Sequence, residues 1–174
     1  VSLTTTTAGN GMYMFGDLVP GTYKITFTTP AGGYTVTSAD EGANDATDSD
    51  AGAMGMTPVF TVTSGDTILT FDAGYYQPAK IGNFVWNDLN ANGIQDAGEP
   101  GIGGVEVLLS GTEGDGDIVN LTTTTDATGM YMFGNLLTGT SLAPGTYKLT
   151  FVTPAGGYVP TQVDDPQATD LTDS

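Results

Sequence analysis

The sequence predicts an all-β protein built as a β-sandwich, and three observations support this fold class. Short segments in which apolar and polar residues alternate recur along the chain. Glycine, proline, aspartate and asparagine residues separate these segments, as they do in turns. No stretch repeats its apolar residues with a helical period over three turns. Short strands at this spacing are typical of two sheets packed face to face.

The strands can be placed in chain order. The clearest alternating segments are 23–27, 59–63, 67–71 and 105–109. In the first of them, alternation places three side chains on the face that we expect to form the core: Tyr23, Ile25 and Phe27. The segment 84–86 is apolar throughout, and we expect it to be a strand that leads into a polar loop.

The chain also repeats itself. Residues 4–18 recur as 122–136, residues 20–27 as 144–151, and residues 29–34 as 153–158. The repeated part includes the sequence Met-Tyr-Met-Phe at 12–15 and again at 130–133. We expect this motif to be a strand with one face in the core.

The repeat predicts two domains, 1–78 and 79–174, each an incomplete copy of one β-sandwich. The first copy lacks a counterpart of residues 80–118, which hold an N-terminal strand and the polar loop. The second copy lacks a counterpart of residues 50–78, which hold the C-terminal strands. We therefore expect the chain to be a window on a longer tandem array, with a mass above 17.8 kDa.

Charge and composition exclude several classes of function. The 174 residues include 20 acidic and three basic side chains, giving a formal charge of −17, with no histidine or cysteine. Thiol nucleophiles, disulfides, Ser-His-Asp triads and ordinary zinc sites are thereby excluded. Because phosphate binding depends on basic residues, nucleic acid is not an expected partner. No apolar run approaches the roughly 20 residues that span a bilayer, so we expect no membrane insertion by this segment.

The run from Asp88 to Glu99 has the spacing of an EF-hand calcium loop. Oxygen-bearing side chains stand at positions 1, 3, 5, 9 and 12 of the run, and Gly93 stands at position 6, where a sharp turn is needed. The predicted calcium ligands are Asp88, Asn90, Asn92, the backbone carbonyl of Ile94, Asp96 directly or through water, and Glu99. The alternative is a polar turn with accidental spacing.

A second calcium site is predicted around a short acidic segment. The carboxylates of this segment recur in part near the end of the chain: Asp45, Asp48 and Asp50, then Asp170 and Asp173. A cation relieves the repulsion among such carboxylates. Because calcium takes six to eight oxygen ligands, the site needs more donors. The candidates are Asp115, Asp117 and Asp126. The alternative is that these aspartates lie in solvated loops.

Residues 80–88, the loop that follows and residues 100–105 resemble the opening of a calcium-binding B-repeat. Such repeats occur in serine–aspartate-repeat surface proteins and are related to the B-type domains of collagen adhesin. The family pattern continues in residues 125–133, 144–147 and 71–76. The resemblance implies tandem prealbumin-like or Ig-like β-sandwiches with calcium-binding loops. One departure is Ala8, which stands where the second copy has Asp126, so a site that uses this aspartate would be altered in the first copy.

The residues and the resemblance together imply a non-enzymatic, extracellular structural repeat. We expect a calcium-stabilised rigid stalk or filament segment of a cell-surface or secreted protein, with neighbouring repeats as partners. Two other functions remain open. An adhesive module would bind a host or cell-surface ligand through loops such as 137–142. An accessory domain would accompany the catalytic domain of a secreted hydrolase.

Overall fold

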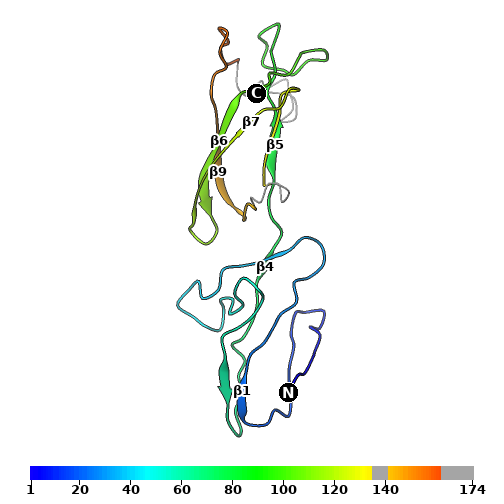
Figure 1. The fold of residues 1–174 in the computed structure, drawn as a ribbon, viewed down its shortest axis with the longest axis vertical. Helices are drawn as coiled ribbons and strands as arrows, with labels where there is room; N and C mark the ends of the chain where they lie inside the picture. Colours follow the sequence, from blue (N-terminus) through cyan, green and yellow to red (C-terminus); the bar gives the residue numbers. More distant parts are fainter. Residues whose placement is uncertain (135–140, 162–174) are drawn as a thin grey trace. The chain divides into compact units, whose positions relative to one another are not determined.

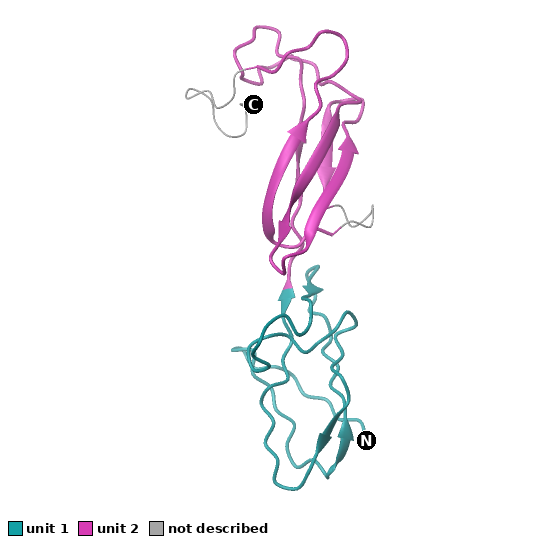
Figure 2. Ribbon diagram, turned by 90° about the vertical axis from the view of Figure 1, so that its left-hand side faces the viewer, with its two compact units in different colours: residues 1–75 teal, residues 76–174 magenta. Residues whose placement is uncertain are grey.

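The computed structural model describes residues 1–134 and 141–161. These residues form strands, turns and irregular segments without a helix, which confirms the predicted all-β fold class. The described part of the chain accordingly holds no helix that could cross a membrane. Figure 2 shows the two compact units into which the chain divides, Val1–Tyr75 and Tyr76–Ser174. The division predicted after residue 78 stays a prediction.

Unit 2 (Tyr76–Ser174) holds two antiparallel sheets (Figure 1). Their strands are β5 (Ile81–Phe84), β6 (Glu106–Glu113), β7 (Ile118–Thr124), β8 (Met130–Phe133) and β9 (Gly145–Phe151). Strand β6 lies between β7 and β9, while β5 pairs with β8. Valine, isoleucine, leucine and threonine dominate β6 and β7, and these residue types suit a half-buried pleated surface. Gly116 turns the chain between them with a φ of 93°, which favours glycine.

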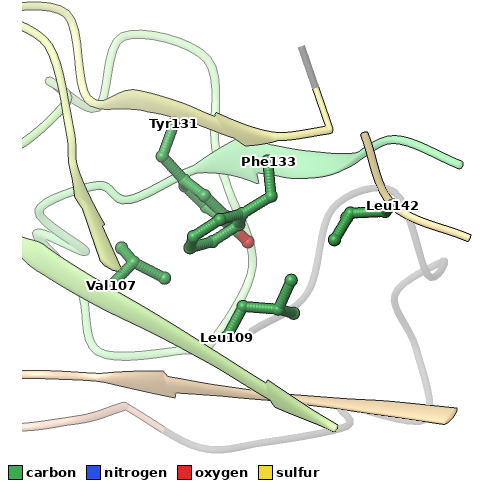
Figure 3. Packing of buried hydrophobic residues seen from close by; sticks show 5 residues of the cluster. All are labelled: Val107, Leu109, Tyr131, Phe133 and Leu142. Atoms are coloured by element: carbon green, nitrogen blue, oxygen red, sulfur yellow. The ribbon is translucent and has the colours of Figure 1, made fainter. Parts of the chain in front are cut away.

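The core of unit 2 lies between these two sheets. Alternation buries Val107 and Leu109 from β6 and Tyr131 and Phe133 from β8. Leu142, which precedes β9, completes the cluster. Figure 3 shows these five side chains pointing toward one another. Because complete burial of a large apolar side chain contributes about 1.5–3 kcal/mol, this cluster is a principal source of stability for the unit.

Unit 1 (Val1–Tyr75) has shorter ladders than unit 2. Strand β1 (Gly21–Tyr23) pairs antiparallel with β3 (Phe60–Val62), and β2 (Thr35–Val36) pairs with β4 (Tyr75–Tyr76). Aromatic contacts supplement these ladders. The ring centroids of Phe60 and Phe71 are 4.2 Å apart, which brings the segment after β3 back onto that strand.

The predicted strand 23–27 is interrupted in the structure. Regular pairing ends at Tyr23, which is opposite Phe60, and resumes only as a single bridge between Thr26 and Met56. The partner segment between these points contains one extra residue and includes Pro58, which has no N–H to donate. Within this interruption the Ile25 N–H donates to the hydroxyl oxygen of Thr57 (3.1 Å).

Two other predicted strands, 12–15 and 67–71, are irregular in the structure. They are joined through a side chain, since the Tyr13 hydroxyl donates to the Phe71 carbonyl (2.7 Å). The segment 130–133, by contrast, forms β8 as predicted, and its ladder partner is β5. No segment of residues 1–75 repeats the β5 sequence, so the copy at 12–15 lacks the strand that would set its register.

Both units contain the same local tyrosine bond. The Tyr23 hydroxyl donates to the Val19 carbonyl (2.6 Å), and the Tyr147 hydroxyl donates to the Ala143 carbonyl (2.5 Å). In each unit the acceptor immediately precedes the sequence Pro-Gly-Thr-Tyr. The sequence repeat therefore returns as a repeat of local structure.

Replacement of Leu109 by alanine is expected to lower the free energy of unfolding by about 2–5 kcal/mol, because it leaves a cavity between the sheets. Chemical denaturation followed by circular dichroism measures the loss. Ile118→Ala is the matched control, since Ile118 lies in the neighbouring strand with 79% of its surface exposed. Its effect should stay below about 1 kcal/mol, and equal losses in the two variants would contradict the assigned core.

Candidate metal centre

The loop from Asp88 to Glu99 is held at its base by unit 2. The Asn87 N–H donates to the Pro100 carbonyl (2.8 Å), and Trp86 forms a bridge with Gly101, so the two ends of the loop lie side by side. Just before this pair, the Val85 N–H donates to the Gly129 carbonyl (2.8 Å). The loop therefore begins from a base that is hydrogen-bonded to the turn preceding β8.

Asp88 organises the first half of the loop. Its Oδ1 accepts hydrogen bonds from the N–H groups of Asn90 (3.3 Å), Ala91 (2.6 Å) and Asn92 (3.3 Å). Its Oδ2 accepts one from the N–H of Gly93 (2.8 Å). The chain turns around this carboxylate through two residues in the left-handed backbone region, Ala91 with a φ of 60° and Gly93 with a φ of 80°. Gly93 therefore stands where a turn without a side chain is favoured, as the sequence predicted.

Glu99 closes the second half of the loop. Its Oε1 accepts a hydrogen bond from the Leu89 N–H (2.8 Å), and its Oε2 accepts one from the Asp96 N–H (3.0 Å). The carboxylate of Glu99 thus lies next to Leu89, the residue that follows Asp88. This closure brings the two ends of the predicted ligand set together.

The remaining polar side chains of the loop meet at Asp96. Its Oδ2 accepts hydrogen bonds from the side-chain amides of Asn90 (2.8 Å) and Asn92 (3.1 Å). The Asn92 Oδ1 also accepts one from the Ile94 N–H (2.8 Å). Side-chain hydrogen bonds therefore link three of the predicted ligands, Asn90, Asn92 and Asp96, whereas Asp88 is bonded to backbone N–H groups. Each predicted ligand offers an oxygen atom, the donor that hard cations such as calcium prefer.

Hydrogen bonding lowers the pKa of Asp88. Partial desolvation of the carboxylate raises this pKa, but the amides of Gly93, Ala91, Asn92 and Asn90 together outweigh it and hold the pKa below its usual range. Asp88 is therefore an anion at neutral pH.

In the described residues, no three histidine, cysteine, aspartate or glutamate side chains are grouped so as to hold a metal ion. The assignment of calcium to the loop therefore stays a prediction.

The acidic segment of unit 1 docks against residues that the sequence reasoning did not include. The Asp50 Oδ2 accepts a hydrogen bond from the Asp72 N–H (2.7 Å), and the Asp50 N–H donates to the Asp72 carbonyl (3.1 Å). Asp50 is only 6% exposed, whereas Asp45 is exposed. Asp72 belongs to the sequence Phe-Asp-Ala-Gly at the end of the repeat. Its position directly after a predicted strand is the sequence feature that could have identified it as a member of this acidic group.

The pKa of Asp50 is shifted in the opposite direction to that of Asp88. Burial raises the pKa of Asp50, the Asp72 amide opposes this effect, and the negative charges of Asp45, Asp72 and Asp40 add to the rise. The pKa of Asp72 is also raised, by burial first and then by Asp48 and Asp45. The negative charges of neighbouring carboxylates thus contribute to both raised pKa values, and the second calcium site stays a prediction.

The other predicted ligands are distributed over unit 2. Asp115 and Asp117 lie in the turn between β6 and β7, where the Asp117 N–H donates to Asp115 Oδ1 (3.2 Å). Asp126 lies in the turn between β7 and β8, and its Oδ1 accepts bonds from the Thr128 N–H (2.8 Å) and hydroxyl (2.6 Å). The seven residues of β7, roughly 20 Å of strand, separate these turns, so one ion cannot bind to both. Asp170 and Asp173 lie outside the described residues.

The pKa of Asp88 is expected to be lower than that of Asp50 when both carboxyl carbons are titrated by NMR without divalent cations. Because the folded-state pKa of Asp88 is depressed, its stabilising contribution is full above the ordinary aspartate pKa and is lost as pH falls through the folded value. The pH dependence is opposite for Asp50, whose folded-state pKa is raised. Its contribution to stability is full below the ordinary aspartate pKa and is lost as pH rises through the folded value. The opposite order of titration would contradict both hydrogen-bond assignments.

Comparison with known proteins identifies the family to which the repeats belong. The family model of the SdrD B-like domain matches residues 1–75 and 79–174. The serine-aspartate repeat-containing protein D of Staphylococcus aureus strain Newman is 43% identical over 161 residues, which are 92% of this chain and 11% of that protein. Protein C of strain N315 is 44% identical over 154 residues, 87% of this chain and 15% of that protein. The chain thus spans a small part of these relatives' length, and it belongs to the SdrD B-like domain family.

Proposed function

We propose that this chain is a non-enzymatic structural segment of an extracellular, cell-surface protein, in which calcium binding stabilises tandem β-sandwich units as a rigid stalk or filament. The family match and the similarity to serine-aspartate repeat-containing proteins support the general role of a repeat segment. The observation that supports the calcium part is the closed Asp88–Glu99 loop, in which Glu99 accepts a hydrogen bond from Leu89 and Asp96 accepts bonds from Asn90 and Asn92. The partners would be the neighbouring repeats of the same polypeptide.

The loop offers enough oxygen donors for calcium. Asp88, Asn90, Asn92, Asp96 and Glu99 supply side-chain oxygens, and Ile94 supplies a backbone carbonyl. These six groups reach the lower end of the six to eight ligands that calcium takes. A bound ion would neutralise carboxylate charge in a chain whose formal charge is −17.

Calcium binding would act on stability through the base of the loop. The loop leaves the sandwich after β5, and residues Val85 and Asn87 tie its two ends to the turn before β8 and to Pro100. Ordering the loop therefore reinforces the packing of β5 and β8. An ion that binds only the folded loop adds its binding free energy to the stability of the unit.

Removal of calcium by a chelator is expected to lower the melting temperature of the full chain. An ion at 100 times its dissociation constant stabilises by about 2.7 kcal/mol, which corresponds to a shift on the order of 10 °C for a unit of this size. Differential scanning calorimetry measures the shift, with readdition of calcium, and of magnesium as control, after dialysis. The same melting temperature in excess chelator and in calcium would rule out a structural calcium ion.

The variant Glu99→Gln is expected to weaken calcium binding at least tenfold, because it removes one carboxylate charge and the bidentate grip of the final ligand. Titration calorimetry measures the affinity, and the fluorescence of the single tryptophan, Trp86, at the base of the loop provides an independent signal. Glu106→Gln is the matched control, since Glu106 is an exposed residue of β6 with the same change in charge. Equal affinities in the two variants would show that Glu99 is not a ligand.

A further inference from the structure

The methionines of this chain occupy unusual positions. The sequence contains six methionines and no cysteine, so thioethers are its only sulfur groups. Methionine ordinarily fills gaps in protein cores. Here most of the side chains are at the surface, with the following exposed fractions: Met12 68%, Met14 63%, Met54 76%, Met130 54% and Met132 49%.

The exposure of Met130 and Met132 follows from strand alternation. Tyr131 and Phe133 of β8 point into the core, so the methionines between them point to the opposite face. Across the ladder from Met132 stands Gly82 of β5, which has no side chain to cover the thioether. The close approach of the Tyr131 carbonyl excludes even a Cβ at that position.

The same arrangement recurs in unit 1. Met12 and Met14 occupy the repeat positions of Met130 and Met132, and both are exposed while Tyr13 and Phe15 between and after them are partly buried. Each unit therefore presents a pair of thioethers to solvent, with the aromatic residues of the same motif turned inward. The two pairs are Met12/Met14 and Met130/Met132, termed the methionine pairs below.

We propose that the methionine pairs are a modification site, at which peroxides oxidise the thioethers to sulfoxides without disturbing the sandwich. A lone pair of the sulfur attacks one oxygen of hydrogen peroxide, and the O–O bond breaks. The sulfur gains that oxygen and loses two electrons, while the departing hydroxide takes up the proton and leaves as water. No cysteine thiolate competes for the oxidant in this chain.

The position of the pairs explains why the fold tolerates this change. A sulfoxide is polar and disrupts a packed core, but it remains hydrated on a face that is already exposed. Met56 provides the internal contrast. It is partly buried, its backbone forms the bridge to Thr26, and its sulfur lies 3.8 Å from the Nζ of Lys24. Met56 is therefore less exposed than the four methionines of the pairs.

Graded treatment of the full chain with hydrogen peroxide, followed by peptide mass spectrometry, tests the proposal. Each of the four methionines in the pairs should gain one oxygen atom several-fold faster than Met56. The melting temperature after their oxidation should equal that of the untreated chain, and methionine sulfoxide reductases should remove the added oxygen. Oxidation of Met56 at the same rate as the pairs would overturn the proposal, as would unfolding once only the pairs and Met54, which is 76% exposed, are oxidised.

The double variant Met130→Leu/Met132→Leu is the matched control. It keeps the apolar volume and removes both thioethers, so we expect unit 2 to lose its two rapid sites while its melting temperature is unchanged. Rapid oxidation of Met12 and Met14 should persist in this variant, because unit 1 carries its own pair. If the variant still gained oxygen rapidly at residues 130–133, the thioethers would not be the site and the proposal would fail.

Discussion

The packing of β8 against β6 is the interaction on which the rest of unit 2 depends. Tyr131 and Phe133 meet Val107 and Leu109 between the sheets, and this contact fixes which face of each strand is inside. A shift of one residue in either register would exchange the buried and exposed sets. The same contact determines where the turn before β8 lies, and this turn accepts the hydrogen bond from Val85 at the base of the Asp88–Glu99 loop. The packing of the core therefore also determines the position of the loop.

Backbone amides take the place of basic side chains in this acidic protein. With only three basic residues among 174, few carboxylates can be neutralised by ion pairs. Asp88 accepts hydrogen bonds from four successive amides, Asp66 accepts one from Thr63, and Glu113 accepts one from Ala143. Such bonds favour the charged form without a counterion. Asp50 has one such amide, which is insufficient against burial and neighbouring charge.

The sequence predicts those features that depend on local spacing. The fold class follows from alternation, and the polar loop around Gly93 follows from a pattern in which every position has a defined role. Features that depend on distant partners were not accessible in the same way. Segment 67–71 alternates as a strand should, yet it contacts Phe60 through a ring and forms no ladder. Asp72 was missed because its contact with Asp50 joins residues 22 positions apart. The separation of Asp117 from Asp126 becomes evident only once the seven residues of β7 are known to lie between them as a strand.

The repeated tyrosine bonds bear on how tandem copies of similar sequence fold correctly. Tyr23 and Tyr147 each bond to a carbonyl four residues earlier, so the contact closes a very short loop and can form before distant strands meet. Similar neighbouring units are at risk of exchanging strands, because a strand of one copy also fits the other. A contact that each copy completes with its own residues favours assembly within the unit. Each of the two hydroxyl groups thus links its strand to a residue of its own copy.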